Sequence, residues 1–455
     1  MVPFETQWKL TTVRIKYCHR TPSGDEMHRD HDSSVCRRFA AASFMAILLA
    51  ATGAQAQTET IPRFDFSFSN PGARSLGFGG AFAALADDAT AANANPAGLV
   101  QLTEPEVSVE ARFWNRSLSF IAGGRFDGEP TGMGIDTRNG LVVGRDNRQG
   151  FGPSFASVVI PKGRWSFALY GHELAQFEEG IESQGIFSDE ENLLPPIRSL
   201  GGREAVDFKV VTAGMAAGWR MNDTLSFGLG IVFSDVSLIA QSEVFLPDDD
   251  SVEALFGRIS FLPDRLIATS TLSMEGSDVT INAGMLGRIS EQVSAGLFYR
   301  QGAKAEGTSH FELGPAAPFT ASFQHDAVLK VPDVAGAGLA YRSKDGRVTL
   351  ATEVDHVAYS GLIQVMSTEE REVVVREYED AWEYHLGAEY ALLQSKPILA
   401  FRAGAWVENG ADLEERKLTH LSGGIGIALQ PFQVDLAGDF SKERDNVSLS
   451  FIYTF

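Results

Sequence analysis

The sequence has 455 residues, 44% of them hydrophobic, and a formal net charge of −21. It has no run near the roughly 20 apolar residues of a membrane-spanning helix, so a helical membrane protein is not expected. The acidic balance argues against a nucleic-acid partner, because phosphate binding depends on lysine and arginine. The many glycines and phenylalanines, 45 and 31, favour short strands and turns over a disordered chain.

Residues 1–56 are predicted to be an N-terminal extension and signal peptide that is removed. Arg37 and Arg38 precede an apolar run, which ends shortly before Ala54 and Ala56 of an A-x-A site. A basic flank, a short apolar run and such a site define a secretory signal peptide. We therefore expect cleavage after Ala56.

Two further expectations concern this leading segment. Its polar first part does not belong in a signal peptide, so translation is expected to begin downstream, for instance at Met27. Both cysteines, Cys18 and Cys36, precede the cleavage site. The processed chain would then have neither a disulfide nor a thiolate metal site.

Residues 57–105 are predicted to form a compact segment that plugs the lumen of a barrel. The segment is rich in glycine, alanine and asparagine, with one helix-compatible stretch at Ala81–Ala92. Pro71 and Pro96 prevent regular hydrogen bonding near its ends.

Residues 106–455 are predicted to form an all-β, antiparallel transmembrane barrel of about fourteen strands. In the last ten residues, Val447, Leu449 and Phe451 share one face and Ser448 and Ser450 the other, as strand geometry requires. An even number of strands suits a closed barrel, which leaves no unpaired edge in lipid. The expected strands start near Val107, Pro153, Trp165, Phe208, Leu225, Asp278, Val293, Ala327, Val348, Trp382, Ile398, Leu421, Gln433 and Val447.

Connectors at 127–150, 178–204, 247–264 and 366–380 are expected to be extracellular loops. Alternation alone leaves a soluble sandwich open, in which the apolar faces would pack on a second sheet. Charged residues opposite the apolar faces favour a wet lumen. The predicted lumen charges are Glu353, Asp355, Glu383, His385, Glu389 and Arg402. Trp382, Tyr384 and Tyr390 are expected in interfacial girdles.

The run from Asn70 to Leu99, with A-D-D-A followed by Asn95-Pro96-Ala97, resembles the hatch of the FadL/TodX family of outer-membrane transporters. The proline-led strand at Val331–Tyr341 and the terminal Phe455 also resemble that family. The resemblance implies a fourteen-stranded barrel and passive uptake of long-chain fatty acids or aromatic hydrocarbons. It also implies that ligand leaves sideways through a gap in the wall.

Two groups of residues are candidates for the ligand path. Asn95, Pro96 and Ala97 are predicted to form a gate, because an asparagine side chain can cap a turn that proline fixes. Aromatic side chains commonly line apolar pockets, which makes several phenylalanines candidate ligand contacts. These are Phe64, Phe66, Phe68, Phe78 and Phe82, for which hatch packing is the competing interpretation.

The remaining motifs do not predict a metal site, a nucleotide site or a catalytic site. His172-Glu173 begins like the zinc motif H-E-x-x-H, but Gln176 replaces the second histidine, and we place it at a loop edge. Gly77, Gly79 and Gly80 lack the spacing of a nucleotide loop. No nucleophile signature is found, and neither a metal nor a cofactor is expected.

The sequence thus predicts a bacterial outer-membrane channel for fatty acids or other hydrophobic small molecules, and not an enzyme. Its expected partners are the hydrophobic ligand, outer-membrane lipid and the barrel assembly machinery. One alternative is a secretion or attachment accessory barrel without transport, which predicts a sealed lumen. Another is a lipid-modifying barrel enzyme, which predicts a nucleophile and a base within hydrogen-bond reach.

Overall fold

The computed structural model describes residues 70–189, 197–248, 255–366, 372–373, 378–409 and 417–455. The predicted signal peptide with Ala54 and Ala56, and the candidate contacts Phe64, Phe66 and Phe68, lie outside these residues. Within the described part, no helix is long and apolar enough to cross a membrane.

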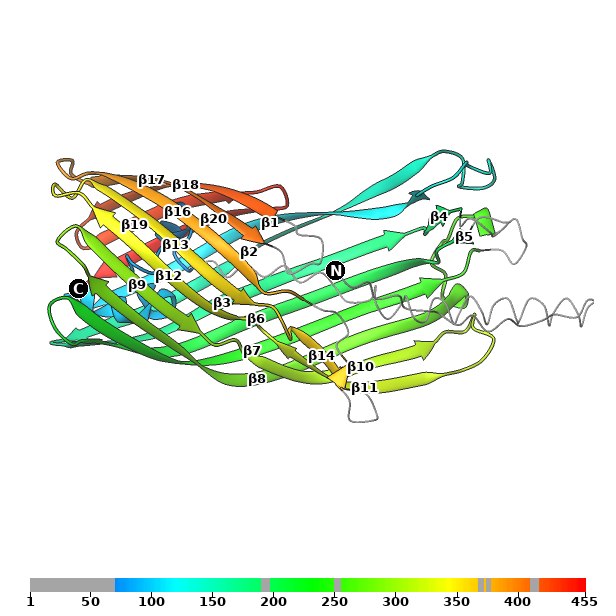
Figure 1. The fold of residues 1–455 in the computed structure, drawn as a ribbon, viewed down its shortest axis with the longest axis horizontal. Coiled ribbons are helices and arrows are strands. Elements are labelled where there is room, and N and C mark those ends of the chain that lie inside the picture. The colour runs from blue at the N-terminus through cyan, green and yellow to red at the C-terminus, as the bar shows by residue number, and fades with distance from the viewer. Residues whose placement is uncertain (1–69, 190–196, 249–254, 367–371, 374–377, 410–416) are drawn as a thin grey trace, which may run out of the picture. The chain divides into compact units, whose positions relative to one another are not determined.

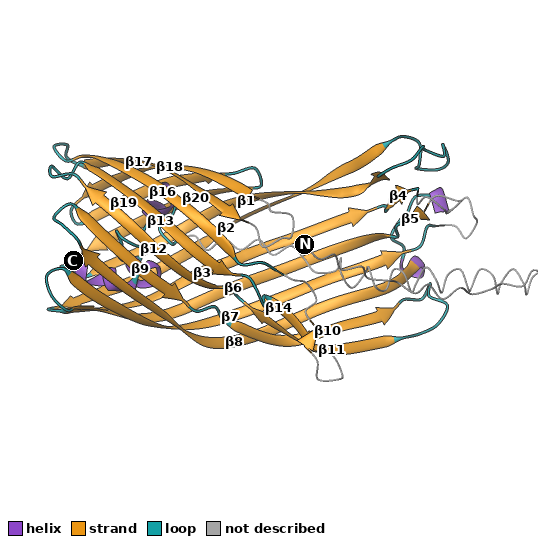
Figure 2. Cartoon of the chain, viewed as in Figure 1, coloured by secondary structure: helices purple, strands orange, loops and turns teal. Residues whose placement is uncertain are grey.

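Strands dominate the described chain (Figures 1 and 2). The few helical elements are α2 (Ala73–Gly77), α3 (Ala91–Ala94), η1 (Pro96–Gln101) and η3 (Pro263–Arg265). The strands are β1 (Glu106–Arg125), β2 (Gly140–Lys162), β3 (Trp165–Ser183), β4 (Ile186–Ser188), β5 (Ile197–Arg198), β6 (Gly201–Arg220), β7 (Leu225–Phe245), β8 (Leu266–Arg288), β9 (Val293–Arg300), β10 (Lys304–Leu313), β11 (Ser322–Lys330), β12 (Asp333–Arg342), β13 (Val348–Ala358), β14 (Ile363–Met366), β15 (Glu372–Val373), β16 (Ala381–Leu392), β17 (Ile398–Asn409), β18 (Lys417–Leu429), β19 (Phe432–Phe440) and β20 (Arg444–Thr454).

Within the described residues these segments form a closed antiparallel barrel of fourteen strands. Three wall strands are each interrupted and consist of two segments: β9 with β10, β11 with β12, and β13 with β14. The segments β9 and β10 both pair with β8. In the next wall strand β12 pairs with β9 and β11 with β10, and in the one after it β13 pairs with β12 and β14 with β11. The barrel closes between β1 and β20, from Glu106↔Thr454 to Arg116↔Arg444. The predicted barrel and its strand number are therefore confirmed.

The alternation that predicts strands also separates the two faces of the wall. On β20, Leu449 and Phe451 are exposed on the outer face, whereas Ser448 and Ser450 are buried inside. The outer side chains have no protein neighbour layer to cover them, as in the apolar band of an outer-membrane barrel. Lipid chains can therefore cover this apolar outer face of the wall.

The outer face changes character at one rung of the wall. Below the rung Val211↔Asp235↔Ser277, β7 exposes Phe227, Leu229, Ile231 and Phe233. At and above it most exposed positions are polar, including Asp207, Asp235 and Glu275, although Val211 and Ile239 remain exposed apolar residues. Since periplasmic turns of such barrels are short and the outer loops long, the upper strand halves project outside the membrane.

Three of the expected loops are partly strand, including 366–380, which contains β15 (Glu372–Val373). Residues 140–150 of the expected loop 127–150 belong to β2, and 178–183 and 201–204 belong to β3 and β6. Likewise, β8 begins at Leu266 and not near Asp278. The pattern is missed there because these strand ends stand outside the membrane, where no apolar outer face is required. The loop expected at 247–264 does lie between β7 and β8.

The helix-compatible stretch Ala81–Ala92 does not form one helix. The structure has only α3 at its end, and the chain turns at Ala86, which has a positive φ of 36°. Asp88 accepts a hydrogen bond from the backbone N–H of Thr90, which begins a new short helix in place of continuing one.

Candidate functional site

The described part of the predicted hatch, residues 70–105, is called the hatch segment below. From 70 to 100 its residues are all buried except Arg74 and Asp87, which are partly buried. Its short helices α2, α3 and η1 contact strands of the wall from within the barrel (Figure 2). A segment with so little regular structure needs partners for many backbone groups.

Inward-facing side chains of the strands supply those partners. Glu110 accepts from the Gly72 N–H at 2.9 Å, and Glu353 accepts from the Ala83 N–H at 2.6 Å. Ser226, Asn282 and Ser294 donate to carbonyls of Ala97, Asn93 and Ala84 at 2.9, 2.7 and 2.8 Å. The barrel wall thus holds the hatch segment by backbone contacts on several sides.

Asn95-Pro96-Ala97 fits against a row of glycines. Asn95 is fully buried; its Oδ1 accepts from the Ala97 N–H at 3.2 Å, and its Nδ2 donates to the carbonyl of Ala83 at 2.8 Å. Gly218, Gly228 and Gly284 are paired in register on β6, β7 and β8. A Cβ on Gly228 would lie 2.2 Å from the Ala97 nitrogen, so only glycine admits this turn.

Two more glycine pairs receive other hatch turns. Gly296 and Gly338 are cross-strand partners, and a Cβ on Gly296 would lie 2.1 Å from the Ala83 oxygen. Gly387 and Gly404 are partners on β16 and β17, and a Cβ on Gly387 would lie 2.3 Å from the Phe78 oxygen. The inner face therefore contains three glycine seats for the hatch backbone.

A chain of ion pairs links the hatch segment to two wall strands, β12 and β16, which lie on either side of β13. Asp87 contacts Arg342 of β12 at 2.8 Å and Arg74 of the hatch at 2.5 Å. Arg74 continues to Glu389 on β16 at 3.5 Å. Although burial opposes ionisation, the guanidinium groups of Arg74 and Arg342 hold the pKa of Asp87 below its ordinary value.

The same ion-pair chain extends along the wall. Arg402 on β17 contacts Glu389 at 2.7 Å and Asp435 on β19 at 2.6 Å. Both predicted lumen residues thus lie on the inner side, where they hold opposite charges together. Because the Arg402 and Asp435 side chains are almost fully buried, each depends on the other for its charge compensation.

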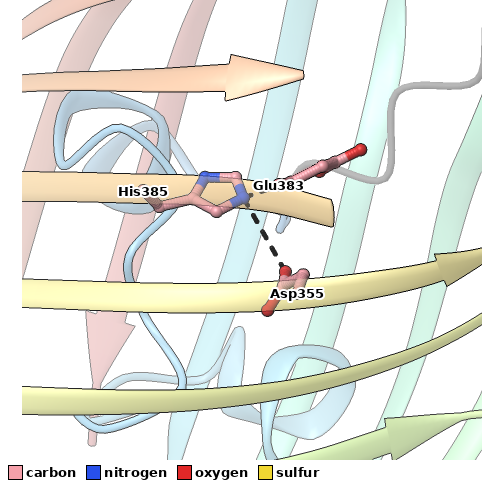
Figure 3. Close-up of side chains that lie close together, drawn as sticks. All are labelled: Asp355, Glu383 and His385. Carbon is pink, nitrogen blue, oxygen red and sulfur yellow. Dashed lines mark ion pairs between the residues drawn. The ribbon is translucent and has the colours of Figure 1, made fainter. Parts of the chain in front are cut away.

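The other four predicted lumen residues occupy adjacent positions on β13 and β16. Glu353 faces His385 across the two strands, and Asp355 faces Glu383. Figure 3 shows Asp355, Glu383 and His385 directed toward one another. All four side chains are buried, and His385 donates from Nδ1 to the carbonyl of Gly79 at 2.8 Å. Gly79 and Gly80 take positive φ values of 66° and 81° to place that carbonyl against the wall.

A second buried histidine lies nearby in a different environment. His420 stacks on Trp406 with ring centroids 4.3 Å apart. Its Nδ1 contacts Asp439 at 3.0 Å and its Nε2 contacts Glu408 at 3.3 Å. A carboxylate thus lies beside each nitrogen of His420, whereas one nitrogen of His385 faces a carbonyl.

Above the hatch, the inner face of the wall becomes apolar. We call this group the upper apolar cluster; all its members are buried and pack on one another across several strands. On β7, Val236, Leu238 and Ala240 face inward at the level where Asp235 faces outward. Its other members include Phe177, Val206, Phe208, Val210, Leu272, Met274, Phe298, Leu329 and Val331.

The three strand interruptions add to this cluster. The chain breaks between β9 and β10, β11 and β12, and β13 and β14, and Ala303, Val331 and Tyr359 at the breaks are buried in the cluster. The Val331 N–H donates to the Ala303 carbonyl at 2.8 Å, which keeps the breaks aligned. The three interruptions therefore place buried apolar side chains in the barrel interior at one level.

The wall between β2 and β3 is paired over only part of its length. Pairing runs from Lys162↔Trp165 to Phe155↔His172, and β3 then bulges at Leu174. Beyond this point the described part of β2 continues to pair with β1 alone, and Leu174 packs on the upper apolar cluster. His172 is thus a buried strand residue, and its expected place at a loop edge is wrong.

Phe78 and Phe82, the described candidate ligand contacts, have no exposed surface. Both belong to a cluster that joins the hatch segment to the wall, and Arg74 lies over the Phe82 ring at 5.8 Å. The upper apolar cluster was not predicted from the sequence. The available signal was that β6 and β7 keep apolar residues on the inner face after their outer face has become polar.

Comparison with known proteins identifies the chain. Residues 184–419 match the family model described as outer membrane protein transport protein (OMPP1/FadL/TodX). The chain belongs to this family. It is therefore an outer-membrane β-barrel of a family of hydrophobic-compound transporters. No curated protein matches the sequence.

Solved members and homologues of the OMPP1/FadL/TodX family have the same fold. A Pseudomonas aeruginosa FadL homologue superposes with a TM-score of 0.61 at 14% identity, over 86% of this chain and 99% of that one. The Pseudomonas putida toluene transporter TodX gives 0.57 at 16% identity, with the same coverage. The Ralstonia pickettii toluene transporter TbuX gives 0.56 at 16%, again over 86% and 99%. At these identities the likeness concerns the fold alone.

Proposed function

We propose that this protein is a passive channel for long-chain fatty acids or other hydrophobic small molecules, and that its hatch segment gates the route. The ligand enters among the side chains of the upper apolar cluster. It then leaves sideways between β2 and β3, where pairing stops at Phe155↔His172. Movement of Asn95-Pro96-Ala97 in its glycine seat opens the lower part of the interior.

The observation that carries this proposal is the reversal of polarity along the wall. In the membrane the outer face is apolar and the inner face charged. Above the rung at Asp235 the outer face is mostly polar, apart from Ile239, and the inner face is mostly apolar, apart from the buried Arg116–Glu179 ion pair. A channel for water or ions would be lined by polar side chains, whereas an apolar inner face suits an apolar ligand. Transfer of a ligand into it is favourable by about 0.8 kcal/mol for each buried CH₂, so no energy source is required.

Two further observations support the route. Leu174, at the bulge where β3 leaves β2, packs on the upper apolar cluster, so an apolar surface leads to the interrupted pairing. The names of structural relatives, which include toluene transporters and a monoaromatic hydrocarbon channel, also support a small apolar ligand. No nucleophile, cofactor or energy-coupling motif is needed for this function.

A binding measurement on the purified full chain in detergent tests the proposal. The probes are a fluorescent long-chain fatty acid and, separately, toluene. Leu238→Asp places a carboxylate in the upper apolar cluster, and we expect affinity to fall by tenfold or more, about 1.4 kcal/mol or greater. Ser237→Asp, on the outer side of the same strand, is the matched control and is expected to bind normally.

Two outcomes would count against the proposal. If the wild-type chain binds neither probe, the protein is an accessory barrel with a sealed interior and the transport function is lost. If Leu238→Asp binds as the control does, the ligand uses another part of the molecule. Uptake into vesicles by Pro96→Ala tests gating alone, since normal uptake in that variant removes the gate and leaves the channel.

A further inference from the structure

The four buried polar residues on β13 and β16 form a compact group with incomplete partners. His385 Nε2 lies 3.5 Å from Glu383 Oε2 and 3.8 Å from Asp355 Oδ2. Both separations exceed the roughly 2.9 Å of an N–H···O hydrogen bond. Within the described residues, His385 Nε2, Asp355 Oδ1 and Glu353 Oε1 have no hydrogen-bond partner, although all three residues are more than nine-tenths buried.

The tautomer of His385 is set by the hatch. Its Nδ1 faces the carbonyl of Gly79 at 2.8 Å, and a carbonyl can only accept, so Nδ1 carries a proton. The lone pair of the neutral ring then lies on Nε2, directed at the two carboxylates (Figure 3). A histidine that ligates a metal typically donates its other N–H to a carbonyl or carboxylate in this way.

Fully ionised, the carboxylates of the group outnumber the cations beside them. The carboxylates of Glu353, Asp355 and Glu383 interact electrostatically with a single guanidinium, that of Arg300. With all three carboxylates ionised and His385 neutral, the group carries two net negative charges in a buried position, a costly state that protonation or a bound cation relieves. A divalent cation supplies the missing charge, whereas a protonated His385 supplies only half of it.

We propose that Asp355, Glu383 and His385 bind one divalent transition-metal ion, of which Zn²⁺ fits best. One candidate ligand atom from each residue lies within 4.8 Å of the others. Zn²⁺ bonds of about 2.0–2.1 Å place tetrahedral ligand atoms about 3.3 Å apart, so small side-chain movements complete the site. An imidazole nitrogen disfavours Ca²⁺ and Mg²⁺, which prefer oxygen ligands.

The proposed ion joins the wall to the hatch. It bridges β13 and β16 and fixes the His385 tautomer that donates to Gly79. Glu353, next to the site, holds the Ala83 N–H of the same hatch segment. The metal therefore stabilises the closed position of the hatch, a role that sequence reasoning, which expected no metal, did not indicate.

Zinc content of the purified full chain tests the site. The chain is isolated without a histidine tag, stripped with chelator, incubated with Zn²⁺, desalted and measured by mass spectrometry of the metal. We expect about one retained zinc per chain, none in Asp355→Asn and His385→Gln, and about one in His420→Gln. His420 is the matched control, because it is also a buried histidine between two carboxylates but lies outside the proposed site.

A second measurement avoids dependence on the folding of variants. X-ray absorption of zinc-loaded wild-type protein should show a nitrogen and oxygen shell containing one imidazole, and competition with excess Ca²⁺ or Mg²⁺ should not displace the zinc. Failure of the wild-type chain to retain zinc overturns the proposal. So does equal retention by all variants, or a first shell that lacks an imidazole.

Discussion

Arg402 is held between two carboxylates on different strands, and its side chain is almost completely buried. Such a pair contributes little compared with an apolar pair of the same size, but removal of one member leaves a buried charge without compensation. Alternation along β17 indicates that Arg402 takes the inner side of the wall. It does not indicate that Asp435, on β19, lies opposite, because that pairing depends on the lateral order of the strands.

Replacement of Arg402 tests this dependence. Arg402→Met leaves Asp435 without its cation and Glu389 with Arg74 alone, so we expect the free energy of unfolding to fall by about 3–5 kcal/mol. The measurement is denaturant unfolding in lipid vesicles, followed by tryptophan fluorescence. Arg148→Met, which removes an exposed pair with Asp146, should change stability by no more than about 1 kcal/mol. A loss for Arg402→Met no larger than that control would contradict the assignment.

The glycine seats are properties of neighbouring strands and not of single residues. Gly218, Gly228 and Gly284 are distant in sequence but lie side by side on β6, β7 and β8. Each leaves a space that atoms of η1 and its N-cap residue Asn95 fill. A glycine inside a strand pattern signals a close approach of another chain segment, but the sequence does not say which segment approaches.

Gly228→Ala is the most direct test of the seat. Its new methyl group would lie 2.2 Å from backbone atoms of Pro96 and Ala97, which cannot move aside as a flexible side chain could. We expect a loss of about 1–3 kcal/mol in hatch docking, and hence faster proteolysis of the hatch segment in folded protein. Gly423→Ala, whose methyl group meets its nearest neighbour at 3.6 Å, serves as the control. Identical proteolysis of the two variants would show that the seat does not hold the hatch.

At the scale of the whole molecule, the barrel closes without help from the hatch. The ladder between β1 and β20 consists of strand residues alone, and the hatch segment contacts the inner face through its backbone and its short helices. The interior that the hatch occupies is charged in the membrane-spanning part, so it would fill with water on removal of the hatch.

Deletion of residues 70–101 should therefore leave a folded barrel that conducts ions. The expected result is a heat-modifiable band like that of the intact chain in gel electrophoresis, together with stable conductance steps in a planar bilayer. The intact chain should show no such steps under the same voltage. A folded deletion variant that remains closed would mean that the hatch segment does not block the lumen.

The sequence determined the strands because the side-chain pattern of a strand depends only on residues that are neighbours in the sequence. Side chains alternate with a period of two, and lipid requires an apolar residue at every second position of a membrane-spanning strand, so each strand can be recognised alone. The fourteen expected starts each fall in a different wall strand of the structure. Where the strands leave the membrane, at 140–150 and 266–277, that requirement ends and the pattern fades.

Only the tertiary structure decided which inward residues meet one another. Ala83 and Glu353 are 270 positions apart, yet they share a hydrogen bond, and His385 reaches Gly79 across 306 positions. These contacts depend on closure of the barrel and on how deep the hatch lies within it, neither of which has a local signal. The upper apolar cluster likewise arises only when several interrupted strands bring their inner faces together.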